Sequence, residues 1–283
     1  MNVKSLFLYP IKSCQGISLE QAQITAKGLT DINNPQIYDR QFMLVNSKGK
    51  FLTQREFPQM ATIVIQLENN CLSLHSSNGD LAPFKLTPDD RKNNLKVQVW
   101  SSKTIAIDQG DEVAQWLQTA LKIDKTCRLV KQSDQHIRAI DPFYSKKLKQ
   151  PVSFADGFPF LLANTASLDD LNQRLAQKYG DETPHIEMIN FRPNIVVETP
   201  IAFIEDSWKK IQIGSNEFSV VKPCTRCIVT TTNQETGVRN ALKEPLLTLS
   251  EYRKKRAGIM FGQNMIPLNS NIVKIGDSLT VKK

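Results

Sequence analysis

Two cysteines separated by two residues, Cys224 and Cys227, are the residues of this sequence best suited to carry chemistry. Such a pair can be a redox dithiol, half of a zinc site, or two buried thiols that act as small hydrophobic side chains. A redox dithiol usually opens a helix, but the β-branched residues at 228–232 predict a strand. A zinc site needs four ligands, and the three histidines show no ligand spacing. The sequence therefore disfavours the redox and zinc interpretations and leaves the buried-thiol interpretation open.

The charged neighbours of the pair favour a fourth interpretation, a single metal-binding thiolate. Lys222 and Arg226 flank the cysteines, and nearby positive charge favours the thiolate form. A thiolate is a soft metal ligand, but one thiolate cannot hold a metal alone. It could complete the coordination of a metal that an organic cofactor brings, and such a cofactor would need an anchor, usually a phosphate group.

Basic and polar side chains at predicted strand ends could bind that phosphate. Lys12 and Ser13 follow the first predicted strand, Arg40 precedes another, and Arg192 and Asn194 stand at the start of a third. Arg and Lys bind phosphate through charge-assisted hydrogen bonds. Taken singly, each of these residues could equally be an ordinary surface residue.

The elements that must position these residues are mostly short strands. Turn residues separate strand-like runs into hairpins at 42–53 and 61–75, and residues 95–100 alternate as a half-buried strand does. Helices are expected at 111–121, at 167–179 with Ser167 as its cap, and at 246–255. Further strands are expected at 191–197, 210–213, 218–221, 228–232 and 272–275. Without regular alternation of strand and helix, this pattern predicts a β-dominated α+β fold.

The composition is that of an ordinary globular protein. The 283 residues carry 36 basic and 28 acidic side chains, a formal charge of +8, and 40% are hydrophobic. No apolar run reaches the roughly 20 residues that span a bilayer, and no signal peptide is apparent, so we expect a cytoplasmic protein without a membrane partner. The basic residues are dispersed, and their two densest groups, at 146–149 and 253–256, are expected to be solvated rather than to bind nucleic acid.

Several of these segments, taken in order, resemble the motifs of the MOSC-domain molybdenum enzymes. The resemblance is closest to the mitochondrial amidoxime-reducing component and its bacterial relatives, and it spans nearly the whole chain. The matching segments are residues 9–16, 39–40, 190–195, 224–227, 244–246 and 261–264.

The resemblance implies an N-terminal β-barrel-like MOSC domain over 1–125 and a MOSC domain over 126–283, with molybdenum cofactor between them. It implies that Cys227 is the catalytic residue and the metal ligand, and that Cys224 supports it. The residues that it implies for cofactor binding are Lys12, Ser13, Arg40, Arg192, Asn194 and Arg226.

The activity implied is the reduction of N-hydroxylated compounds (hydroxylamines, amidoximes and N-hydroxylated bases) to amines or amidines, a detoxification that needs no pyridoxal phosphate. The electrons are expected from a separate ferredoxin-, flavodoxin- or cytochrome b5-like protein, because no further cysteines are grouped to hold an iron–sulfur cluster. The sequence departs from the family pattern at Asn264, where the mitochondrial relatives have a tyrosine, and at 155–158, where Gly157 belongs to a segment that replaces a Ser/Thr-rich turn. Substrate shape is therefore left open.

Two alternatives from other classes remain. A MOSC protein could carry molybdenum cofactor or sulfur without turnover. A nucleic-acid-binding module is suggested only by the sequence pI of about 9.2.

Overall fold

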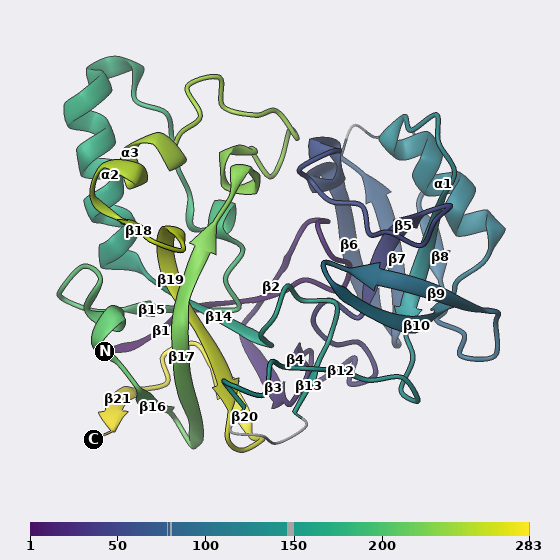
Figure 1. Cartoon of the computed structure of the whole chain (residues 1–283), viewed down its shortest axis with the longest axis horizontal. Coiled ribbons are helices and arrows are strands. Elements are labelled where there is room, and N and C mark those ends of the chain that lie inside the picture. The colour runs from purple at the N-terminus through teal and green to yellow at the C-terminus, as the bar shows by residue number, and fades with distance from the viewer. Residues whose placement is uncertain (78, 80, 146–149, 283) are drawn as a thin grey trace.

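The computed structural model describes residues 1–77, 79, 81–145 and 150–282, and strands dominate it. Two strand-rich halves lie side by side, one built mainly from residues 42–132 and the other mainly from residues beyond 150 (Figure 1). The expectation of a β-dominated α+β fold is confirmed. The basic group at 146–149 lies outside the described residues.

A nine-stranded sheet forms most of the second half. Only β14 and β15 pair in parallel among its described strands. A bridge joins Asn2 of β1, next to one edge strand, to Ser278, which directly precedes the opposite edge strand β21, so the sheet curls around its own core. The strands in spatial order are β2 (Ile17–Leu19), β1 (Asn2–Leu8), β15 (Ile195–Glu198), β14 (Phe160–Asn164), β19 (Gly258–Pro267), β17 (Asn216–Arg226), β16 (Lys210–Ile213) and β21 (Leu279–Lys282), and β18 (Lys254–Lys255) pairs with β19.

The first half contains two antiparallel sheets around helix α1 (Asp111–Leu121). The expected hairpin at 61–75 is present as β6 (Ile63–Glu68) and β7 (Cys71–Ser76). At 42–53 the turn forms, but only the single bridge between Val45 and Phe51 replaces a second full strand. The other strands of these sheets are β5 (Phe42–Asn46), β8 (Phe84–Leu86), β9 (Asn94–Val99), β10 (Ser102–Asp108) and β11 (Cys127–Gln132).

The N-terminal strands pack on the core of the second half. Val3 and Leu6 of β1 share a hydrophobic cluster with Phe160 and Ile195, and β1 pairs directly with β15. Two small sheets complete the strands of the structure: β3 (Gln21–Thr25), β4 (Gly28–Thr30) and β20 (Ile272–Lys274) form one, and β12 (Arg138–Ala139) and β13 (Pro151–Val152) form the other. The division of the chain at 125/126 stays a prediction.

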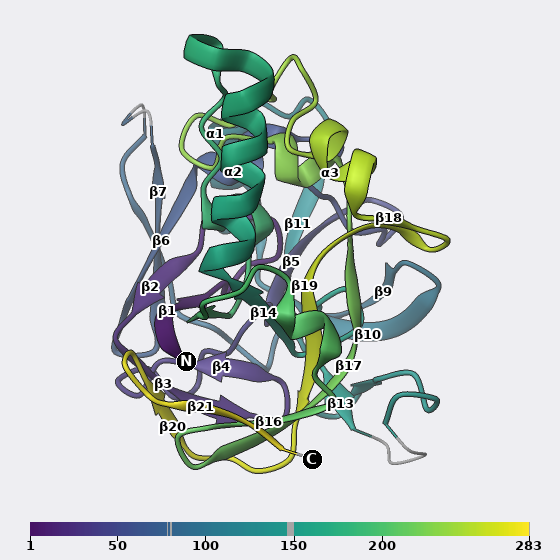
Figure 2. The same ribbon diagram turned by 90° about the vertical axis from the view of Figure 1, so that its left-hand side faces the viewer.

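The helices lie near their expected positions, with corrections at their ends. Helix α1 is confirmed, and α2 (Thr165–Tyr179) packs on the large sheet beside α3 (Leu246–Tyr252) (Figure 2). The expected cap Ser167 is wrong: Asn164 caps α2 by accepting from the Ala166 amide, while the Ser167 hydroxyl donates to Glu205 at 2.8 Å. The third helix ends at Tyr252, before Arg253, which pairs with Asp206.

Two expected strands are partly or wholly 3₁₀ helix. Residues 228–232 form η5 (Ile228–Thr231), because the hydroxyls of Thr230 and Thr231 donate to carbonyls three residues back. Residues 191–197 divide between η3 (Met188–Phe191) and β15. The remaining 3₁₀ segments are η1 (Pro58–Thr62), η2 (Gly180–Glu182) and η4 (Ile204–Ser207). No helix in the described part of the chain combines the length and the apolar character that crossing a membrane requires.

Candidate functional site

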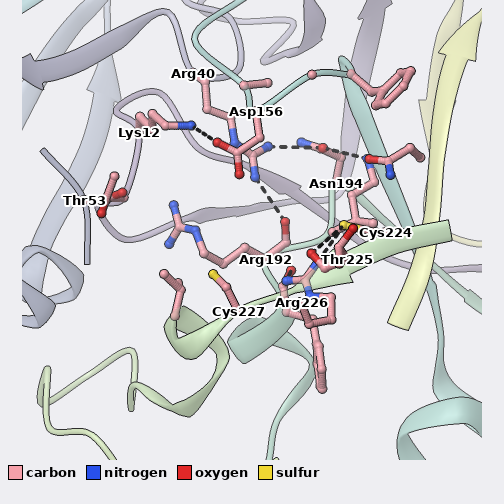
Figure 3. A pocket seen from close by; sticks show the side chains of 18 of the residues that line it. Lys12, Arg40, Thr53, Asp156, Arg192, Asn194, Cys224, Thr225, Arg226 and Cys227 are labelled. Carbon is pink, nitrogen blue, oxygen red and sulfur yellow. Dashed lines mark hydrogen bonds and ion pairs between the residues drawn. The ribbon is translucent and has the colours of Figure 1, made fainter. Parts of the chain in front are cut away.

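A cleft brings together all seven site residues that the sequence analysis named (Figure 3). The described residues that line it come from two parts of the chain, 12–55 and 155–264. It offers about 140 Å³ of space for water-sized molecules. The seven residues are Lys12, Ser13, Arg40, Arg192, Asn194, Arg226 and Cys227.

Positive charge dominates the cleft wall. Five of the residues that line it are basic, and Asp156 is the single carboxylate among the described lining residues. Like charges repel one another strongly when they are shielded from water, so a wall of this kind favours an anionic occupant. The basic residues are Lys12, Arg40, Arg55, Arg192 and Arg226.

Three of the predicted residues have a backbone conformation that is rare outside glycine. The φ angles of Ser13, Arg40 and Arg192 are 70°, 49° and 54°. A residue other than glycine in the left-handed region is held there by its surroundings at a cost in free energy, and such residues cluster at binding sites. The strained positions therefore mark this cleft as a functional site independently of its charge.

An aromatic ring holds two of the guanidinium groups. The central carbons of Arg40 and Arg192 each lie 4.4 Å from the ring centroid of Tyr9, a distance typical of cation–π contact. Tyr9 is fully buried, and burial raises the pKa of its phenol to about 12, so the ring stays neutral. Tyr9 is therefore a neutral platform that positions both arginines.

Arg192 is a buried cation of the cleft that has an unused hydrogen-bond donor. Its Nη1 donates to Gln234 Oε1 at 3.1 Å, but the buried Nη2 has no hydrogen-bond partner among the described residues. Burial lowers the pKa of Arg192 to about 10, because the charged form loses its hydration. A buried cation with an unused donor is unfavourable unless an anion pairs with it.

Asn194 has its amide engaged by the protein. Its Oδ1 accepts from Arg40 Nη1 at 3.2 Å and from the Leu161 amide at 3.1 Å, and its Nδ2 donates to Asp39 Oδ1 at 2.9 Å. Asn194 therefore positions the guanidinium group of Arg40. The expected contact of Asn194 with a cofactor stays a prediction.

The two cysteines differ in their surroundings. Arg226 Nη1 donates to the Cys224 sulfur at 3.0 Å, and its Nη2 donates to the Phe191 carbonyl at 2.6 Å. The sulfur of Cys227, which follows β17 directly, receives no hydrogen bond from the described side chains and faces the cleft (Figure 3). Lys222 is not among the described residues that line the cleft, and its ammonium lies 5.3 Å from the ring centroid of Tyr144. Cys227 is the better placed of the two sulfurs for a ligand in the cleft.

Two family descriptions match most of the chain. Residues 1–124 match the MOSC N-terminal beta barrel domain, and residues 149–280 match the MOSC domain. Mitochondrial amidoxime-reducing component 1 of Mus musculus is 34% identical over 97% of this chain and 80% of its own length.

The chain belongs to the MOSC family. Other relatives of this MOSC protein carry two different names. Mitochondrial amidoxime reducing component 2 of Bos taurus is 36% identical over 89% of this chain and 72% of its own length. Molybdenum cofactor sulfurase of Oryza sativa subsp. japonica is 31% identical over 99% of this chain but only 34% of its own length. Among solved structures, a Bordetella bronchiseptica protein overlaps 42% of this chain and 92% of its own at 19% identity, with a TM-score of 0.33.

The structure adds residues to the MOSC site that the sequence analysis did not assign to it. Arg55 lines the cleft, and its guanidinium carbon lies 4.5 Å from the ring centroid of Trp100. Asp156 accepts hydrogen bonds from Lys12 at 2.5 Å and from Trp100 at 3.1 Å. The departure from the family pattern at 155–158 is the one sequence signal that pointed at Asp156. For Arg55 the sequence offers only a basic residue after a hairpin, which is not a usable signal.

Proposed function

We propose that this MOSC protein binds the molybdenum cofactor in the cleft and reduces N-hydroxylated compounds there. Membership of the family, together with relatives named amidoxime-reducing component and molybdenum cofactor sulfurase, supports a molybdenum-cofactor-related function. The single observation that carries the proposal to this chain is that one basic cleft contains both Cys227 and Arg192, whose Nη2 has no hydrogen-bond partner in the described part of the chain.

The residues present fit this cofactor. An anionic phosphate would satisfy Arg192 Nη2, and Lys12, Ser13 and Arg40 border the same space. In the part of the chain that the structure describes, no three His, Cys, Asp or Glu side chains are grouped as a metal site. A metal in this cleft would therefore depend on a cofactor for ligands besides the thiolate of Cys227.

The protein's own groups would bind and orient the reactants. When bound, the molybdenum cofactor would supply the two-electron redox chemistry. The reduction adds two electrons and two protons to the N-hydroxylated substrate and releases water. Cys227 would contribute the thiolate ligand, Tyr9 would hold Arg40 and Arg192 against the anion, and Asn264, which lines the cleft, would border the substrate.

The partners and the location belong to the same proposal. The substrates would be hydroxylamines, amidoximes or N-hydroxylated bases, and a separate ferredoxin-, flavodoxin- or cytochrome b5-like protein in the cytoplasm would deliver the electrons. The formal charge of +8 supports an acidic donor, because opposite charge speeds encounter. A reduction rate that does not change with ionic strength would argue against that donor.

Metal content tests the cofactor assignment. The protein is produced in a host that makes molybdenum cofactor, and molybdenum is measured by elemental mass spectrometry in the wild type, Cys227→Ala and Cys224→Ala. We expect near-stoichiometric molybdenum in the wild type and in Cys224→Ala, and loss in Cys227→Ala, whose thermal unfolding should stay cooperative although its Tm lacks the contribution of the bound cofactor. Loss in Cys224→Ala alone would overturn the ligand assignment.

The alternative function is that of a cofactor carrier. It is suggested by the rice relative, whose name, molybdenum cofactor sulfurase, refers to the cofactor rather than to a reduced substrate. Turnover separates the two functions. The loaded protein is supplied with benzamidoxime and reduced viologen, a chemical electron donor. Steady formation of benzamidine supports the reductase, and a fully loaded protein that produces none supports the carrier.

A further inference from the structure

The ion pair between Lys12 and Asp156 lies in the wall of the cleft and joins two segments that are 144 positions apart in the chain. Lys12 Nζ lies 2.5 Å from Asp156 Oδ1, and in Figure 3 the two side chains point toward each other. The two partners differ in exposure: the Lys12 side chain is 9% exposed and the Asp156 side chain 62%. The cation is fixed in the wall, whereas the carboxylate reaches it from the open side.

We propose that Asp156 occupies the anion-binding position of Lys12 and is displaced from it by a phosphate group, so that Asp156 sets how tightly the cleft takes a phosphorylated ligand. This inference rests on the proposed function, because it concerns the anion site that the cofactor would use.

Lys12 requires an anion in this position. Burial lowers the pKa of its ammonium, while the neighbouring Asp156 acts in the opposite direction. The Phe51 ring, 5.5 Å from Nζ, gives the charge only weak further support. A buried ammonium left without a partner is strongly unfavourable, so the departure of Asp156 must be matched by the arrival of another anion.

Asp156 is free to move without unfolding its turn. Arg138 Nη1 donates to the carbonyls of Ser153 and Ala155 and thereby holds the backbone before Asp156. A Cβ added at the next residue, Gly157, would meet no heavy atom within 4 Å, so open space borders the turn. Among the described residues, a side-chain rotation toward solvent breaks only the bonds of Asp156 to Lys12 and to Trp100 Nε1.

Electrostatics make the two anions mutually exclusive. Asp156 and a phosphate group that both contact Lys12 would lie within a few ångströms of each other, where like charges repel. A phosphate presents more acceptors than one carboxylate oxygen and lies within the field of Arg40 and Arg192 as well. The phosphate therefore displaces the carboxylate when its concentration is sufficient.

The test uses protein from a host that cannot make molybdenum cofactor, with inorganic pyrophosphate as the probe. Isothermal titration calorimetry gives the Kd for the wild type, Asp156→Asn and Lys12→Met. Removing the competing charge is expected to tighten binding roughly tenfold in Asp156→Asn, and Lys12→Met is expected to weaken it. Asp134→Asn is the matched control, because Asp134 pairs with Lys27 at the same 2.5 Å outside the cleft, and its Kd should equal that of the wild type.

A second readout follows the carboxylate in the wild type itself. The indole N–H of Trp100 donates to Asp156, so its ¹⁵N–¹H resonance, assigned with Trp100→Phe, should shift on addition of pyrophosphate. An unchanged resonance at saturation, or a Kd that is equal or weaker in Asp156→Asn, would overturn the inference. If the protein produced in a host that makes molybdenum cofactor still loads molybdenum through Cys227, the proposed function stands while this inference fails.

Discussion

The phenol ring of Tyr9 supports the guanidinium group of Arg192, whose central carbon lies 4.4 Å from the ring centroid. The ring in turn depends on Gly16, since a Cβ added there would lie 2.4 Å from Tyr9 Cε1. A glycine in the loop after the first strand thus determines where the buried cations of the cleft lie.

Gly16→Ala should destabilise the protein for this steric reason. Overpacking of a buried contact typically lowers the free energy of unfolding by about 1–3 kcal/mol, and we expect a loss in that range. Urea unfolding measures it, with Gly157→Ala as the control, because no heavy atom lies within 4 Å of a Cβ at Gly157. Equal stability of the two variants would show that the Tyr9 ring has room to move.

Arg192→Met should separate stability from anion binding. The guanidinium is buried with an unused donor, so its removal should leave the Tm of the cofactor-free protein within a few degrees of the wild type. The rise in Tm that pyrophosphate produces in the wild type should disappear. Differential scanning fluorimetry with and without pyrophosphate measures both effects. A variant that still gains the full Tm increment would remove Arg192 from the anion site.

The Lys12–Asp156 pair should make stability depend on acid pH. Partial desolvation in the cleft raises the pKa of Asp156, whose side chain is 62% exposed, but the charge of Lys12 and the hydrogen bonds from Lys12 and Trp100 outweigh this effect and hold the pKa well below its usual range. The stabilisation is therefore complete above the unfolded pKa of about 3.9 and is lost as the pH falls toward the folded value.

Unfolding of the wild type and Asp156→Asn at a series of pH values measures this dependence. Their difference in free energy of unfolding should be constant from neutral pH down to about pH 5 and should shrink below about pH 4. A difference that stays constant through the acid range would contradict the depressed pKa.

The five cysteines should react with iodoacetamide in an order that follows their burial. Burial raises the pKa of Cys14 to about 12 and that of Cys127 to about 11, which leaves little thiolate at mildly alkaline pH. Cys71, Cys224 and Cys227 are only half-buried and should be labelled first. Peptide mass spectrometry after timed labelling measures the order, and urea should make all five react. Labelling of Cys14 in the folded protein as fast as Cys227 would contradict it.

The spacing of apolar residues along the sequence predicted most helices and strands correctly. Helix α1 follows from an apolar stripe at helical spacing, and its residues Val113, Leu117 and Leu121 are buried as that stripe requires. Local pattern failed where a side chain has a competing partner. The β-branched run at 228–232 coils into η5 because threonine hydroxyls bond to nearby carbonyls, and Ser167 does not cap α2 because Glu205 accepts its hydroxyl.

The sequence by itself determined most of the residue types that meet at the site, because the ordered motifs contain both thiols, the ammonium of Lys12 and three of the four guanidinium groups of the described cleft wall. Only the tertiary structure decided which of their atoms are already satisfied. Tyr9 supports Arg192 across 183 positions of the chain, and Asp156 meets Lys12 across 144. The physical reason is that contacts between such distant positions depend on the pairing of β1 with β15 inside the large sheet, and no local periodicity encodes that pairing.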